Sequence, residues 1–371
     1  MTARREIFAG VMSGTSLDGV DAVLADFTPG PAAGALLAAT HVAFPSDLKR
    51  ELAALQEAGP DEIVRAARAA NALADLYVHA LKSVCLAADV AAHDVVAAGV
   101  HGQTVRHRPH EGWTLQVNNP ARLAERAYMT VVADFRMRDV AAGGQGAPLV
   151  PAFHAARFAR PGRARVVVNV GGIANVTILP ARGDVRGFDT GPGNVLLDLA
   201  SQRHLGAPYD EGGAWAASGV ADAALLAALL DEPFFASPPP KSTGRDLFNA
   251  GWLDAALLRA PWRGRAEDLQ ATLTLLTART IADAVRVHAP ETSDVLVCGG
   301  GARNAALMRS LAAALPGVAV DTTESEGVAT DHVEALAFAW LAREALAGRP
   351  GNLPAVTGAA GPRVLGAIYP R

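Results

Sequence analysis

A pattern that occurs twice is the feature that most constrains the fold of this 371-residue chain. Each copy has two strand-length apolar runs joined by a glycine-bearing turn, then a long helical pattern, then a buried strand ending in a polar turn. The first copy predicts strands at residues 7–12, 20–27 and 95–100 and a helix at 63–88. The second predicts strands at residues 166–170, 174–179 and 295–298 and a helix at 266–288. This alternation predicts a duplicated α/β architecture, in which two similar halves create a cleft for a ligand.

The composition excludes several classes of protein. Lys and Arg number 33 and Asp and Glu 37, so the net charge is −4 and the basic excess of a nucleic-acid binder is absent. The only cysteines, Cys85 and Cys298, rule out a disulfide scaffold and a four-cysteine zinc site, and they favour the reducing cytoplasm. Because no apolar run approaches the roughly eighteen residues of a membrane span, no membrane association is expected. The apolar stretch near the N-terminus is too short for a signal peptide.

The first motif with chemical content lies in the turn after the first predicted strand, at residues 10–21. Its small residues let backbone N–H groups approach an anion, and Ser13, Thr15 and Ser16 add hydroxyl donors. Asp18 is suited to hold Mg²⁺ through water, so the loop fits a nucleotide phosphate. An ordinary hairpin turn uses the same residue types and has equal weight. The loop is not a Walker motif, because Gly-Lys-Ser/Thr occurs nowhere in the chain.

A second motif, GFDTGPGN at residues 187–194, places an acidic residue at the end of a strand. Residues 189–194 are predicted to form a Gly/Pro-rich turn before a helix at 195–203. In the functional interpretation Asp189 projects at the mouth of the cleft, while Gly191 and Gly193 approach phosphate. In the structural interpretation Asp189 is the N-cap of the helix.

A third motif, CGGGARN at residues 298–304, joins a strand to a helix. Three consecutive glycines can lie flat under a purine and its ribose. The spacing differs from the dinucleotide fingerprint G-x-G-x-x-G. A tight strand-to-helix turn is the structural alternative.

A fourth group of residues surrounds HGQT at residues 101–104. Arg136 and Arg138 alternate on a strand-like segment and could clamp a substrate carboxylate bidentately, with a surface ion pair as the alternative. His101 would bind substrate or cap a strand. No further ligands accompany His107 and His110, which argues against a metal site there.

A fifth motif begins the last long helix. Asp331 and Glu334 have the spacing of a capping box, which makes Asp331 the N-cap. In the alternative, Glu334 reaches the cleft from the start of the helix.

Eight segments, in order, resemble the anhydro-N-acetylmuramic acid kinase family, which belongs to the superfamily of acetate and sugar kinases, the heat-shock ATPase and actin. They are VMSGTSLDGVDAVL, GVHGQTVRH, TVVADFRMRDVAAGGQGAPLVPAFH, NVGGIANVT, GFDTGPGN, PPPKSTGRDLFN, CGGGARN and EALAFAWLA. The resemblance implies two RNase H-like (actin-like ATPase) domains around a central nucleotide cleft. It places one domain at residues 1–133 plus about 345–371 and the other at 134–344.

The resemblance implies that 1,6-anhydro-N-acetylmuramate, ATP and water give N-acetylmuramate 6-phosphate and ADP, in murein recycling and amino-sugar catabolism. Its general base corresponds to Asp189, which would act on water. In a superfamily kinase for an ordinary sugar hydroxyl, Asp189 would deprotonate the substrate itself. An actin-like assembly protein and a sugar-sensing module are the alternatives from other classes.

The resemblance also implies the partners, which are an amino sugar and ATP as substrates and Mg²⁺ as the metal. It is compatible with a homodimer. The sugar pocket would be lined by Thr104, Arg136, Arg138 and Glu334, and Asp18 would face the metal through water. Many relatives read LQIG(D/E) where this chain has Leu115 to Asn119, which lacks the acidic residue. The nucleotide would be bound by Ser13, Gly14, Thr15, Ser16, Leu17, Asp18, Gly19, Val20, Gly171, Gly172, Gly191, Gly193, Asn194, Gly299, Gly300, Gly301 and Asn304.

Overall fold

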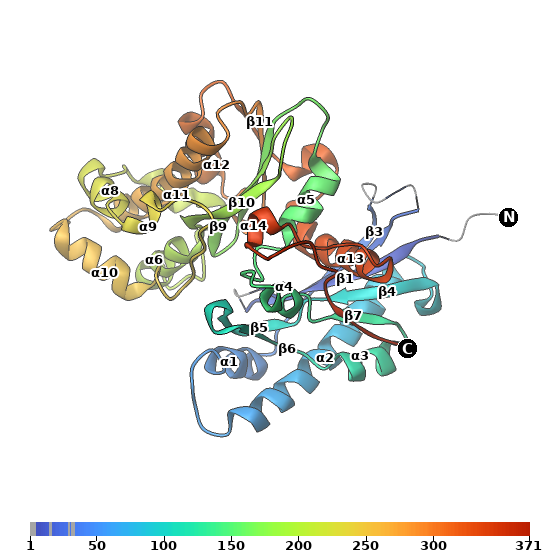
Figure 1. The fold of residues 1–371 in the computed structure, drawn as a ribbon. Coiled ribbons are helices and arrows are strands. Elements are labelled where there is room, and N and C mark those ends of the chain that lie inside the picture. The colour runs from blue at the N-terminus through green and yellow to red at the C-terminus, as the bar shows by residue number, and fades with distance from the viewer. Residues whose placement is uncertain (1–4, 15–16, 29, 31–33) are drawn as a thin grey trace. The chain divides into compact units, whose positions relative to one another are not determined.

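The computed structural model describes residues 5–14, 17–28, 30 and 34–371, and the chain divides into two compact units (Figure 1). Unit 1 comprises the chain up to Arg157 together with His332–Arg371, and unit 2 comprises Phe158–Asp331. The sequence places these boundaries at about residues 134 and 344. Residues 134–157 belong to unit 1 in the structure. They are connected to the C-terminal part of that unit, because the carboxylate of buried Asp139 accepts hydrogen bonds from Asn352 and Thr357.

The central sheet of unit 1 has six strands in the order β13-β7-β4-β1-β2-β3. Neighbours β1, β2 and β3 are antiparallel, whereas β1, β4 and β7 are parallel, and β13 is antiparallel to β7. A separate hairpin joins β5 to β6. The strands are β1 Ile7–Met12, β2 Gly19–Asp26, β3 Ala35–Ala43, β4 Val95–Val100, β5 Gln103–Arg108, β6 Trp113–Val117, β7 Val131–Ala133 and β13 Ala367–Tyr369.

The sheet of unit 2 has five strands in the order β10-β9-β8-β11-β12. Here β8, β9 and β10 are antiparallel and β8, β11 and β12 are parallel. The strands are β8 Arg165–Val170, β9 Ile173–Leu179, β10 Arg186–Pro192, β11 Asp294–Cys298 and β12 Ala319–Thr322. Both sheets therefore contain the same five-strand order and directions, which confirms the duplicated RNase H-like α/β fold.

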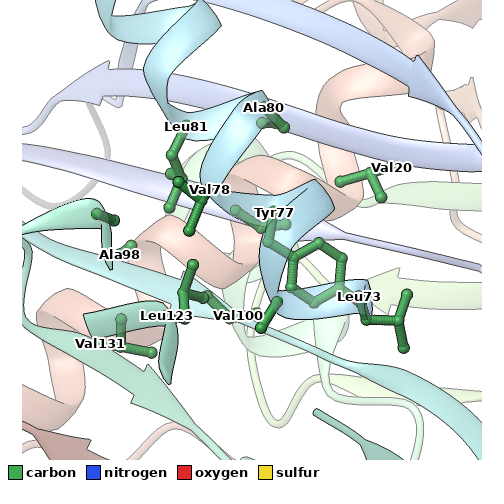
Figure 2. Close-up of a cluster of buried hydrophobic side chains, with 14 of the residues drawn as sticks. Val20, Leu73, Tyr77, Val78, Ala80, Leu81, Ala98, Val100, Leu123 and Val131 are labelled. Atoms are coloured by element: carbon green, nitrogen blue, oxygen red, sulfur yellow. The ribbon is translucent and has the colours of Figure 1, made fainter. Parts of the chain in front are cut away.

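Helix α2 (Glu62–Ala87) covers one face of the sheet in unit 1. Figure 2 shows its Leu73, Tyr77 and Leu81 beside Val20 and Val100 of the strands. These side chains are fully buried, as the apolar period of the helix predicts. The other helices of unit 1 are α1 Ser46–Ala54, α3 Pro120–Ala127, α4 Met137–Ala141, α5 Val150–Phe158, α13 Val333–Leu346 and α14 Pro354–Thr357.

Helix α13 packs against β1 and β4 through glycine positions, on the face opposite to α2 because strand residues alternate between faces. A Cβ atom at Gly10 would lie 1.9 Å from the carbonyl oxygen of Ala335, and one at Gly99 would lie 1.9 Å from that of Phe338. Any side chain at either position would therefore displace the helix.

In unit 2, α11 (Ala266–His288) and α12 (Ala305–Ala314) bury apolar side chains against β8, β9 and β11. A second cluster joins α6, α8, α10 and α11. The remaining helices of this unit are α6 Val195–Leu205, α7 Ala214–Ser218, α8 Ala223–Leu230, α9 Pro233–Ala236 and α10 Ala250–Arg259. Among the described residues, no single helix has the length and apolar character to cross a membrane; Glu211–Ser218 and Ala223–Leu230 reach that threshold only jointly, across a 120° bend.

The predictions of local structure at residues 189–194 and at Arg136 and Arg138 are wrong. Residues 189–194 are not one turn, because β10 continues to Pro192 and pairs with β9 across a register shift between Asp189 and Gly191. Arg136 and Arg138 do not alternate on a strand. The chain leaves β7 at Asp134, which has a positive φ of 59°, and Arg136 then precedes the first residue of α4.

We predict that the ion-pair network around Arg165 stabilises unit 2. Its side chain is 3% exposed, and its guanidinium lies 2.6 Å from Asp294 and 2.8 Å from Glu326. Arg165→Met leaves two carboxylates without their buried partner and should lower the free energy of unfolding by about 3–5 kcal/mol, measured by urea unfolding. Arg163→Met is the matched control, because Arg163 pairs with the same Asp294 at 2.9 Å but is 53% exposed. Its effect should stay below about 1 kcal/mol, and equal losses for both variants would contradict the prediction.

Candidate active site

Asp189 lies in unit 2 on β10, at the register shift of that strand. Its backbone N–H donates to the carbonyl oxygen of Lys241 at 3.1 Å, and the N–H of Thr243 donates to its Oδ2 at 3.0 Å. The N-cap of α6 is Asn194, so Asp189 is not the N-cap. Both the main chain and the carboxylate of Asp189 are therefore held by one loop.

Burial raises the pKa of the Asp189 carboxyl to about 7, while the Thr243 N–H and the Lys241 charge act in the lowering direction. The Lys241 ammonium donates to the carbonyl oxygens of Phe234 and Phe235, at 3.0 Å each, and lies 4.7 Å from the centre of the Phe234 ring. These anchors fix the cation beside the strand. A carboxyl with this pKa can accept a proton near neutral pH, as a general base must.

The turn between β8 and β9 is bonded to the start of α6. The N–H groups of Gly193 and Val195 donate to the Gly172 carbonyl, at 2.9 and 3.0 Å, and the N–H of Asn194 donates to the Gly171 carbonyl at 2.8 Å. A phosphate contact through the N–H of Gly193 or Asn194 would have to replace one of these bonds. The nucleotide contacts predicted for Gly171, Gly172, Gly191, Gly193 and Asn194 stay predictions.

Two of the three glycines after β11, Gly299 and Gly301, approach the end of β8 closely. A Cβ atom at Gly299 would lie 2.4 Å from Oδ1 of Asn169. That oxygen is buried and has no hydrogen-bond partner in the part of the chain that the structure describes. Asn304 is the N-cap of α12, and its Oδ1 accepts from the Leu307 N–H at 3.0 Å. The side chain of Asn304 thus has the structural role, and the adenosine contacts of Gly299, Gly300, Gly301 and Asn304 stay predictions.

In unit 1, several side chains of the first motif support the loop from inside. The Ser13 hydroxyl is buried and bonds to the Tyr77 hydroxyl at 2.7 Å and the Gly102 carbonyl at 3.2 Å. Leu17 and Val20 are also buried, so these three residues could reach a nucleotide only through their main chain. Thr15 and Ser16 lie outside the described residues.

The exposed end of this motif carries Asp18, whose Oδ1 accepts from the Gly19 N–H at 2.9 Å. The carbonyl of Gly14 accepts from the Gln103 side chain at 3.1 Å. Across the described residues, no group of three or more His, Cys, Asp or Glu side chains is placed to hold a metal ion. In that part of the chain, Asp18 therefore belongs to no such group of three.

The structure brings Arg136 and Glu334 together in unit 1. Arg136 donates to Nε2 of buried His101 at 2.9 Å and to the Gly146 carbonyl at 2.7 Å. Burial raises the pKa of Glu334; the Arg136 charge opposes this rise, and Asp21 and Asp18 add to it. A carboxyl and a guanidinium placed in this way can bind neutral and anionic groups of a sugar.

The capping box predicted for α13 does not form. The N-cap is His332, which makes no side-chain capping bond, and Asp331 pairs with Arg303 instead. Glu334 is therefore not committed to the helix terminus.

Thr104 and Arg138 have no interaction with Arg136 or Glu334 among those described above. The Thr104 hydroxyl accepts from the Gln116 amide at 3.2 Å. Arg138 is exposed, and because residues two apart in a helical segment do not face each other, it cannot clamp one carboxylate together with Arg136. The sugar contacts of both residues stay predictions.

The sequence assigns no role to Lys241 or Thr243, which the structure places on Asp189. The sequence predicts only that their segment is a proline-rich loop. Thr243 lies 54 residues from Asp189 in the chain, so no local pattern connects the two.

The duplicated fold, with the same strand order and directions in both sheets, places the chain in the actin-like ATPase class that includes sugar kinases. The family model for anhydro-N-acetylmuramic acid kinase matches residues 6–371. A relative of that name from Cupriavidus pinatubonensis is 56% identical, covering 100% of both chains. Another from Burkholderia cenocepacia is 58% identical, covering 98% of this chain and 96% of its own. The chain therefore belongs to the anhydro-N-acetylmuramic acid kinase family.

Among solved structures, a similar one is the activator of 2-hydroxyisocaproyl-CoA dehydratase from Clostridium difficile with bound ADPNP. It has a TM-score of 0.44 and 12% identity, covering 90% of this chain and 93% of its own.

We predict that the Lys241 charge lowers the pKa of Asp189. Lys241→Met should raise that pKa by about one unit, because an opposite charge nearby favours the carboxylate. The measurement is a ¹³C NMR titration of aspartate carboxyls, with Asp189→Asn to assign the signal. Arg186→Gln is the control, because Arg186 bonds to the His288 carbonyl and acts on the pKa of His288. An unchanged pKa in Lys241→Met would contradict the prediction.

Proposed function

We propose that this protein uses ATP to convert 1,6-anhydro-N-acetylmuramate and water into N-acetylmuramate 6-phosphate and ADP, with Asp189 as the general base. The observation that carries the proposal is the half-buried Asp189 carboxyl, which lies at the register shift of β10 and accepts the Thr243 N–H at Oδ2. Burial raises its pKa to about 7, which suits proton transfer. The identity of the substrate is inferred from membership of the family. The reaction serves murein recycling, and we place the enzyme in the cytoplasm.

The chemistry of the substrate explains why the base acts on water. The O6 atom of the anhydro sugar is an ether oxygen without a proton, so its attack on phosphorus alone would leave it positively charged. Water therefore adds to C1 and gives a proton to Asp189, while the electrons of the C1–O6 bond pass to O6. O6 bonds to the γ-phosphorus as the bond from phosphorus to ADP breaks. A positioned base contributes roughly 10²–10⁴-fold to such a step.

Unit 1 supplies the candidate groups for the phosphates and the sugar. The main chain of residues 14–20 and the exposed Asp18 would serve the nucleotide. Magnesium in kinases usually keeps several waters and few protein ligands, which the exposed Asp18 carboxylate fits. When bound, Mg²⁺ neutralises charge on the phosphates. Thr104, Arg136, Arg138 and Glu334 are the candidates for the amino sugar, and homodimer formation is part of the same proposal.

We predict that Asp189→Asn binds ATP but loses catalysis. The rate should fall by at least about 10²-fold, since the amide cannot accept the proton. In the wild-type protein, kcat/KM should fall as the pH drops below about 7, because protonation removes the base. A coupled assay of ADP release measures both. More than a tenth of the wild-type rate in Asp189→Asn would disprove the role of Asp189.

The isotope of the attacking water tests ring opening itself. In ¹⁸O-labelled water, mass spectrometry of the sugar phosphate should find one label on C1, because the new C1–O bond comes from solvent. The free sugar phosphate, incubated for the same time without ATP, corrects for exchange of the anomeric oxygen. A product with no label beyond this background would identify a kinase for an ordinary sugar hydroxyl.

A further inference from the structure

The side chain of Thr243 has an unsatisfied polar atom next to the proposed base. Its Oγ1 is buried and has no hydrogen-bond partner among the described residues, while its N–H donates to Oδ2 of Asp189 at 3.0 Å. A buried hydroxyl without a partner is unfavourable, and such groups in native structures often mark a bound water or a function. We therefore expect this hydroxyl to form a hydrogen bond with a molecule that binds beside Asp189.

The loop on both sides of Thr243 is anchored, so this hydroxyl has a defined place. On one side, the Lys241 ammonium bonds to the carbonyls of Phe234 and Phe235. On the other side, the N–H of fully buried Phe248 donates to the Gly244 carbonyl at 3.1 Å, and its ring stacks on Phe235 at 5.6 Å.

Phe235 also lies against the strand that carries the base. A Cβ atom at Gly191, two residues beyond Asp189, would lie 2.6 Å from the Phe235 ring. The loop and the end of β10 are thus packed against one aromatic group. Thr243 keeps its position relative to Asp189 through both this packing and the hydrogen bond.

We propose that Thr243 holds the attacking water together with Asp189. This inference rests on the proposed function. The Thr243 N–H uses Oδ2, which leaves Oδ1 of the carboxylate for the water. The water donates one hydrogen to Asp189 and the other to Oγ1 of Thr243, so that a lone pair of its oxygen points at C1. Only the hydrogen on the Asp189 side is transferred in the reaction, and Thr243 remains neutral throughout.

Thr243→Val tests this role because it removes the hydroxyl, keeps the shape and keeps the backbone N–H. We expect kcat to fall by about tenfold or more, as for the loss of one buried hydrogen bond. The KM values for ATP and the anhydro sugar should stay within about twofold. The acid limb of the pH profile should not move, because the N–H bond to Asp189 persists. Thr243→Ser should restore most of kcat, and Ser242→Ala, which removes an exposed neighbouring hydroxyl, should change nothing.

Three results would overturn the inference. They are a kcat of Thr243→Val within about twofold of wild type, a raised KM for the sugar with kcat unchanged, and a shifted acid limb that Thr243→Ser does not correct. The second would make Thr243 a sugar-binding residue, and the third a purely structural one. Failure of the proposed function looks different, because the wild-type protein would then release no ADP with the anhydro sugar.

Discussion

The close approach of α13 to the sheet is the constraint on which the candidate sugar-binding group of unit 1 depends. Backbone atoms of the helix lie where side chains at Gly10 and Gly99 would otherwise be. This approach fixes the first turn of the helix, and with it Glu334, within electrostatic range of Arg136. The position of one carboxyl is thus set by two residues that have no side chain.

Unit 2 uses a similar device for a different purpose. There Gly299 and Gly301 bring the segment after β11 against the end of β8, close to Asn169 and Val170. The two sheets share their strand order but carry different chemistry. Unit 1 places its predicted phosphate loop between the first two strands, whereas unit 2 places the candidate base on the third strand. Duplication of the fold therefore provides two equivalent frameworks with separate tasks.

Much of this architecture could be predicted from apolar periodicity. The helix at 266–288 and the strand at 95–100 have the expected ends, because their patterns are long or fully buried. Local composition gave a wrong prediction where contacts between distant parts of the chain determine the local structure. Glycine and proline in residues 189–194 favour a turn, yet pairing with β9 extends the strand, and Gly191 absorbs the irregularity with a φ of 144°. In the site, Asp189 follows from its motif, but Lys241 and Thr243 do not, because only the folded chain brings them to it.

Unit 1 is discontinuous, and this has a consequence for synthesis on the ribosome. The residues of unit 2 emerge before α13 and β13, so the nascent sheet of unit 1 lacks its second covering helix while the whole of unit 2 is translated. During that time the face with Gly10 and Gly99 has nothing of its own to pack against. Because domains tend to fold as units during translation, the later-emerging unit 2 can complete its core first. The half that begins the chain is then the last to mature.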